Sequence, residues 1–201
     1  MDEKTIDVLE KELKDNPKSI FAHHRLALAY WRAGRIEDAA KVFKALLELD
    51  PSNFEARINL GTLLAQAGYL EPAKKQFETA LNIYPSSTEA MVNLGLVYFH
   101  LGDLQKAKEY YEKALEQRPS WPPLLVNLST IYIEEGDLDK AIALCQKAVE
   151  TDSEFSMAYN NMAVAYYQSG DIQKAKEALE KAKSLGYPVN EDLEKAIREA
   201  G

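Results

Sequence analysis

Four asparagines stand at one fixed interval along the chain, and their side chains are the first candidates for binding chemistry. They are Asn59, Asn93, Asn127 and Asn161, each 34 residues after the one before. A carboxamide offers both a hydrogen-bond donor and an acceptor, so it can pair with the main-chain N–H and C=O groups of an extended peptide. Asn93 lies within an otherwise apolar run, VNLGLVYFH, where neither helix propensity nor burial favours asparagine. A binding or positioning role would explain its presence.

The histidines and the single cysteine form no pattern typical of a metal site or a catalytic centre. His23 and His24 are adjacent, so they point to different faces of a helix, and His100 is far away in the sequence. Cys145 stands alone at an apolar position, which excludes a disulfide within the chain. No glycine-rich phosphate loop or nucleophile motif follows a strand pattern. We therefore expect no catalytic residue, no cofactor and no metal.

The interval of the asparagines places other residue types in register as well. Five glycines share it: Gly34, Gly68, Gly102, Gly136 and Gly170. An apolar residue stands eight positions before each glycine: Leu26, Leu60, Leu94, Leu128 and Met162. An alanine stands five positions after each glycine: Ala39, Ala73, Ala107, Ala141 and Ala175. A fixed period of this length indicates a repeat protein, in which each unit packs on its neighbours.

Each repeating unit is predicted to be a pair of amphipathic helices, because apolar residues recur at three- and four-residue steps on both sides of the glycine. Glycine can adopt the left-handed conformation that ends a helix. Asp103, Asp137 and Asp171 directly follow it and are candidates to cap the second helix. Small residues in the first helix, such as Gly61 and Gly95, would let the paired helices approach closely.

On these positions the chain resembles the tetratricopeptide repeat family from Ile20 to Val189. The resemblance implies an all-α fold, a right-handed α-solenoid of helix-turn-helix repeats, and a protein-binding module that uses its concave face. The sequence departs from the family pattern where a tryptophan is usual near the start of the first helix. The residues found there are His23, Arg57, Met91, Leu125 and Tyr159. We expect these departures to affect local packing and not the fold.

We divide the chain into seven parts on this basis. They are a capping helix in residues 1–19, five repeats in residues 20–53, 54–87, 88–121, 122–155 and 156–189, and a second capping helix in residues 190–201. Ile6, Leu9 and Leu13 form one apolar stripe within residues 2–15, and Leu193 and Ile197 do the same near the other end. Terminal helices with a polar outer face keep a stacked array soluble. We expect a complete array, with a piece of a longer chain as the alternative.

The asparagines are predicted to lie on the side of each first helix that faces away from the second helix. The first repeat has Arg25 at this position. The predicted peptide-binding residues are Asn59, Asn93, Asn127, Asn161, Arg25, Val92, Leu96, Phe99, Val126 and Thr130. The apolar members would form a strip that marks a binding surface. The alternative is that the asparagines form hydrogen bonds within or between neighbouring helices.

A second device of the resembling family, a clamp for a C-terminal carboxylate, is not expected here. Its lysine position holds His24, Ile58 or Val92. Its first asparagine position holds Leu28, Thr62 or Leu96. We therefore predict no specific binding of a free C-terminal carboxylate.

Composition and charge limit the remaining possibilities. An apolar fraction of 46% with 28% charged residues is typical of a globular protein that buries a core. The net charge of −8 disfavours nucleic acid as a partner. No apolar run reaches the roughly 20 residues of a membrane helix, and the N-terminus is too acidic for a signal peptide. We expect a cytoplasmic protein that binds a protein or peptide without membrane insertion, with a self-assembling, homo-oligomeric scaffold as the alternative.

Overall fold

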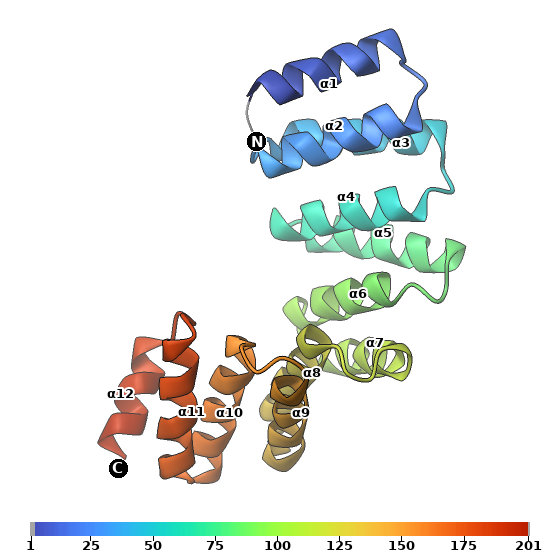
Figure 1. The fold of residues 1–201 in the computed structure, drawn as a ribbon. Coiled ribbons are helices and arrows are strands. Elements are labelled where there is room, and N and C mark those ends of the chain that lie inside the picture. Colours follow the sequence, from blue (N-terminus) through green and yellow to red (C-terminus); the bar gives the residue numbers. More distant parts are fainter. Residues whose placement is uncertain (1–2, 201) are drawn as a thin grey trace. The chain divides into compact units, whose positions relative to one another are not determined.

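The computed structural model describes residues 3–200, and within them the chain forms twelve α-helices and no strand (Figure 1). The prediction of an all-α helical-repeat solenoid is confirmed. The predicted start of the first helix at Asp2, and Gly201, lie outside the described residues. The helices are α1 (Glu3–Asp15), α2 (Ile20–Arg32), α3 (Ile36–Leu49), α4 (Phe54–Gln66), α5 (Leu70–Ile83), α6 (Thr88–His100), α7 (Leu104–Gln117), α8 (Pro122–Glu135), α9 (Leu138–Thr151), α10 (Ser156–Ser169), α11 (Ile172–Ser184) and α12 (Glu191–Glu199).

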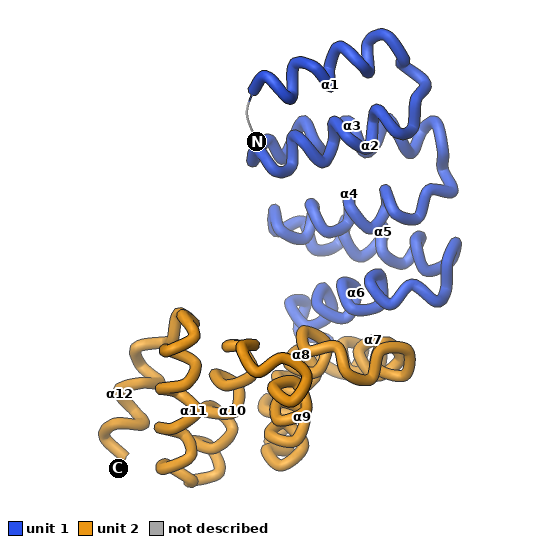
Figure 2. The backbone as a smooth tube through the Cα atoms, viewed as in Figure 1, with its two compact units in different colours: residues 1–103 blue, residues 104–201 orange. Residues whose placement is uncertain are grey.

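The helices divide into two compact units, residues 1–103 with α1 to α6 and residues 104–201 with α7 to α12 (Figure 2). A core of large side chains runs through each unit. In the first it includes Leu9, Leu26, Phe43, Leu46 and Leu60. In the second it includes Leu125, Cys145, Met162, Leu179 and Ile197. Ile6 and Leu9 of α1 belong to the first core, as expected for a helix that covers the end of a repeat array.

The turns within the helix pairs follow the predicted chemistry. The five periodic glycines have φ between 76° and 85°, and no other residue type among the described residues has a positive φ. Glycine adopts this left-handed conformation without the steric cost that a Cβ brings. Asp137 and Asp171 then accept hydrogen bonds from the backbone N–H groups of Lys140 and Lys174, so both carboxylates cap the second helix as predicted.

The predicted close approach of paired helices is seen at Gly61 of α4. A Cβ built on this residue would lie 2.7 Å from Cε1 of Phe77 on α5. The Phe77 ring is buried, so it already fills the space that a larger side chain at position 61 would need.

Tyrosine–glutamate hydrogen bonds link successive helix pairs. The Tyr30 hydroxyl donates to Glu10 Oε1 at 2.6 Å, and the Tyr98 hydroxyl donates to Glu78 Oε1 at 3.1 Å. The Tyr132 hydroxyl is 3.4 Å from Glu112 Oε1. In each pair the glutamate belongs to the helix that precedes the tyrosine helix in the chain. We call these the tyrosine–glutamate pairs.

Candidate functional site

The predicted site residues of the first unit lie on α2, α4 and α6, whose exposed side we call the first-helix face of that unit. On this face the amide of Asn93 has a defined orientation. Its Nδ2 donates to Thr62 Oγ1 at 3.2 Å, and the Thr62 hydroxyl itself donates to the carbonyl of Ile58 at 2.9 Å. Because Thr62 has used its only proton, it must accept from Asn93, and this places the Asn93 nitrogen toward α4.

Asn59 makes the corresponding contact one repeat earlier. Its Nδ2 is 3.0 Å from Nε2 of His24 on α2. With Nε2 unprotonated, the amide donates and the imidazole accepts. The side chain of Asn59 therefore bridges α4 and α2 in the same way as Asn93 bridges α6 and α4.

In the second unit, Asn161 of α10 makes the largest number of such bonds. Its Nδ2 lies 2.9 Å from Thr130 Oγ1, 3.1 Å from Ser129 Oγ and 3.4 Å from the Val126 carbonyl, all on α8. The two hydroxyls donate to the same Val126 carbonyl. Asn161 is 9% exposed, so this network is nearly closed to solvent.

The three amides thus direct their nitrogen toward the preceding repeat, as the alternative interpretation of the asparagines had it. Their carbonyl oxygens are different. No hydrogen bond in the described residues involves Oδ1 of Asn59, Asn93 or Asn161, and no buried side-chain oxygen or nitrogen there lacks a partner. Each Oδ1 is therefore not fully buried and keeps at least some contact with solvent.

Asn127 and Arg25 stand apart from this pattern. Asn127 of α8 is partly buried and makes no side-chain hydrogen bond within residues 3–200. Arg25 lies at the edge of the face, 2.8 Å from Glu12 of α1 and over the exposed ring of Phe21. Its charge is shared with Glu12, so Arg25 is a weaker candidate for recognising a ligand.

A pocket of about 320 Å³ opens beside Asn93 on the first-helix face of the first unit. Leu96 is 38% exposed at this pocket, and His100 forms another part of its wall. Phe99 is partly buried and lies edge-on against His100. Sequence reasoning did not include Gln66, which lines the same pocket and accepts a hydrogen bond from the Trp31 indole.

A smaller pocket of about 220 Å³ lies beside Asn59, nearer the start of the same helices. It brings together His24, Asn59 and the carboxylates of Glu55 and Glu89. The two glutamates were not among the predicted binding residues. Their equivalent positions, as the second residue of α4 and of α6, could have identified them from the sequence.

Two predicted lining residues are buried instead. Val92 is 7% exposed and Val126 is 1% exposed. Val126 belongs to the core of the second unit. Both valines support the face from within and offer almost no surface to a ligand. Thr130 is partly buried and uses its hydroxyl for Val126 and Asn161.

Two other kinds of site can be checked in the described residues. No group of three or more His, Cys, Asp or Glu side chains in residues 3–200 is arranged to hold a metal ion. None of the described helices combines the length and the apolar character that crossing a bilayer requires.

Two family models, both described as tetratricopeptide repeat, match the sequence. One matches residues 30–94 and 132–185, and the other matches residues 88–120. No curated protein sequence matches the chain.

Solved structures share the fold. YrrB, described as a tetratricopeptide repeat protein with an unusual peptide-binding site, is 24% identical with a TM-score of 0.72 and covers 95% of this chain and 97% of its own. MamA from Desulfovibrio magneticus RS-1 is 22% identical with a TM-score of 0.74, over 83% of this chain and 94% of its own. The pilF protein of Pseudomonas aeruginosa is 22% identical with a TM-score of 0.81, over 95% of this chain and 86% of its own.

Proposed function

Since the chain belongs to the tetratricopeptide repeat family, we propose that it is a non-catalytic interaction module that binds an extended, partly apolar peptide on its first-helix faces. Proteins of this family generally mediate protein–protein interactions. YrrB, which shares the fold, is described as having a peptide-binding site.

The observation that carries the proposal is the row of solvent-accessible amide oxygens beside an apolar pocket. Oδ1 of Asn59 and Oδ1 of Asn93 are both open acceptors, one repeat apart. Packed helices lie roughly 8–10 Å apart and an extended chain rises about 3.3 Å per residue, so the two oxygens would accept from about every third peptide N–H. An apolar side chain of the peptide would then enter the pocket at Leu96.

In the second unit, Asn161 of α10 would provide the corresponding acceptor, and Asn127 of α8 would join it without a bond that fixes its amide beforehand. The affinity should be modest. A neutral hydrogen bond contributes about 0.5–1.5 kcal/mol, and the ordering of a flexible peptide offsets part of this gain. Dissociation constants in the micromolar range are therefore expected.

The test starts with peptides that the protein selects from a random peptide library. These peptides are then titrated into the protein and its variants. We expect Asn59→Ala/Asn93→Ala to weaken binding about tenfold or more, which corresponds to two lost hydrogen bonds. Asn82→Ala is the matched control, because Asn82 is exposed on α5, away from this face. Circular dichroism of each variant separates lost binding from lost structure. Equal affinity of the double variant and the parent protein would remove the amides from the mechanism.

The alternative, a self-assembling scaffold, is favoured by large apolar side chains on the surface. Val8, Phe21 and Tyr69 are each more than 60% exposed, at 65%, 67% and 61%. Light scattering over a range of protein concentrations distinguishes the two proposals. A mass that grows with concentration supports assembly, and a constant monomer mass argues against it.

A further inference from the structure

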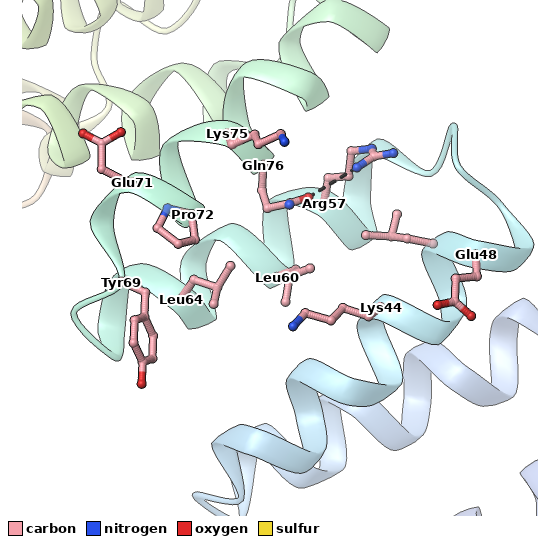
Figure 3. Close-up of a pocket in the computed structure, with 11 residues that line it drawn as sticks. Lys44, Glu48, Arg57, Leu60, Leu64, Tyr69, Glu71, Pro72, Lys75 and Gln76 are labelled. Carbon is pink, nitrogen blue, oxygen red and sulfur yellow. Dashed lines mark hydrogen bonds between the residues drawn. The ribbon is translucent and has the colours of Figure 1, made fainter.

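A pocket larger than those beside the asparagines lies away from the first-helix face, between α3, α4 and α5 of the first unit. Its volume is about 860 Å³. Figure 3 shows the residues that line it. We call it the α3–α5 cleft. Leu47, Leu64 and Pro72 form its apolar surface, and Leu60, which is only 1% exposed, lies behind them. Figure 3 shows Lys44 of α3 opposite Leu60 and Leu64 of α4 across this space.

The cleft lies at the junction of α3 and α4, where both members of the tyrosine–glutamate pair are replaced. Tyr30 and Glu10 form that pair one repeat earlier. The residues 34 positions after them are Leu64 and Lys44. Leucine is smaller than tyrosine and has no hydroxyl, and lysine replaces the carboxylate that would accept its proton. The ring and the hydrogen bond that occupy other junctions are therefore both absent here.

A third replacement lies beside the same space. At the next two junctions, the lysines Lys74 and Lys108 place their ammonium groups 5.9 Å and 4.4 Å from the centres of the Tyr98 and Tyr132 rings. The equivalent residue in α3 is Ala40. Ala40 lines a second hollow of about 290 Å³, which shares Lys44, Leu64 and Tyr69 with the cleft. The opening thus continues along α3.

Three cationic and two acidic side chains line the cleft, although the chain as a whole has a net charge of −8. Lys44 and Lys75 line the cleft, and neither forms an ion pair within residues 3–200. Arg57 donates to the Pro51 carbonyl at 2.7 Å and to Gln76 Oε1 at 3.3 Å, so its guanidinium is fixed at the rim.

Two carboxylates also line the cleft. Glu71 is neutralised by Lys74 at 2.5 Å. Glu48 has no ion pair in the described part of the chain. Three cationic side chains therefore face one uncompensated carboxylate. This balance favours a ligand that carries negative charge.

We propose that the α3–α5 cleft is a second binding site, specific for an acidic peptide segment that contains an aromatic side chain. The aromatic ring enters over Leu64, in the space that a tyrosine fills at other junctions. Acidic residues on either side of the ring pair with Lys44 and Lys75. Concave sites lined by apolar groups with a few charged groups at the rim are typical of ligand sites. This site is independent of the asparagines.

The probe for the test is the capped peptide Ac-Glu-Asp-Glu-Phe-Glu-Asp-Glu-NH2, titrated into ¹⁵N-labelled protein. We expect the largest backbone amide shifts in α3, α4 and α5. The variant Leu64→Tyr/Lys44→Glu restores the pair found at other junctions, so it should fold and fill the cleft. Binding should then weaken about tenfold or more, because both the apolar contact and a charge pair are lost.

Two matched controls make the test specific. The same peptide with serine in place of phenylalanine should bind much more weakly to the parent protein. Asn59→Ala/Asn93→Ala should leave binding of the acidic probe unchanged. Equal binding by Leu64→Tyr/Lys44→Glu, equal binding of the serine peptide, no binding at millimolar peptide, or shifts confined to the first-helix face would each overturn the proposal.

Discussion

Asparagine at the repeating position serves two purposes in one side chain. The nitrogen of Asn59, Asn93 or Asn161 bonds to the preceding repeat, and the oxygen remains open to solvent. A leucine would keep the packing but leave Thr62 or Ser129 without this donor. An aspartate would keep the acceptor but lose the donor. The carboxamide is the common side chain that supplies both at this length.

Gly61→Ala should destabilise the protein by about 1–3 kcal/mol, the usual cost of overpacking a close-packed core. The new methyl group would meet the Phe77 ring, whose Cε1 lies 2.7 Å from the position that the alanine Cβ would take. Urea unfolding followed by circular dichroism measures the change. The double variant Gly61→Ala/Phe77→Leu should be destabilised by less than the sum of the destabilisations of the two single variants. Additive costs would show that the ring and the methyl group do not meet.

Cys145 should resist alkylation in the folded protein. Its side chain is fully buried and its thiol donates to the Ser129 hydroxyl, and burial raises the pKa of the thiol to about 11. The reactive thiolate is therefore scarce near neutral pH, and reagents cannot reach it. Mass spectrometry after iodoacetamide treatment at pH 8 should show slow labelling, and fast labelling in urea. Equal rates in both conditions would contradict the buried position.

Ionisation of the Tyr30 phenol should make the free energy of unfolding depend on pH in alkaline solution. Burial, followed by the hydrogen bond to Glu10, raises its pKa from 10.0 to about 12. Because the folded pKa is the higher one, this contribution is complete below pH 10 and is lost as the pH rises through about 12. The free energy of unfolding should fall over this window. Tyr30→Phe should show a smaller fall, and an identical fall would assign the effect to other groups.

At the scale of helices, the sequence predicted those features that depend on residues close together in the chain. The periodic glycines and the aspartate caps at Asp137 and Asp171 were predictable because a left-handed turn and a cap are local. The core stripe of each first helix was predictable from its period. Val92 and Val126 were placed wrongly in the groove, because their burial depends on how closely adjacent repeats stack.

The tyrosine–glutamate pairs show what the sequence contained and the prediction missed. Glu10, Glu78 and Glu112 each precede their tyrosine by 20 residues, and the two types recur with the period of the repeat. That recurrence was a readable signal for contact between helices. The α3–α5 cleft could not be predicted from the sequence, because a pocket depends on the distances between three helices.

The last helix should be the least protected against hydrogen exchange. α12 has nine residues, and Ile197 is its one buried residue. The ion pair between Lys183 and Glu194 is exposed and adds little. Ile197→Ala should remove protection from α12 and change α10 only slightly, since exchange reports local opening. Arg198→Ala, at an exposed position of the same helix, is the control. Loss of protection throughout residues 104–201 would contradict this local opening.

At the scale of the whole molecule, charge is the property most easily tested. The net charge is −8 at pH 7 and the isoelectric point is near 5.0. Loss of net charge promotes association. Turbidity should therefore peak near pH 5.0 and clear again at pH 7, where repulsion returns. A peak at a different pH would indicate that a specific surface, and not the net charge, controls association.

Repeat architecture also explains how one junction can differ from the others without loss of the fold. Each repeat packs mainly on its neighbours, so a substitution at one junction affects the packing only near that junction. The three replacements at Lys44, Leu64 and Ala40 all fall on one junction of the first unit. The three replacements could be read from the sequence, while the cleft beside them required the structure.

The orientation of the amides sets a rule for what the first-helix face can accept. With their nitrogens committed, Asn59 and Asn93 offer only lone pairs to an incoming chain. An imino acid has no hydrogen to give them. Sequences recovered by selection should therefore avoid proline at about every third position, and N-methylation at those same positions should abolish binding while leaving methylation between them harmless.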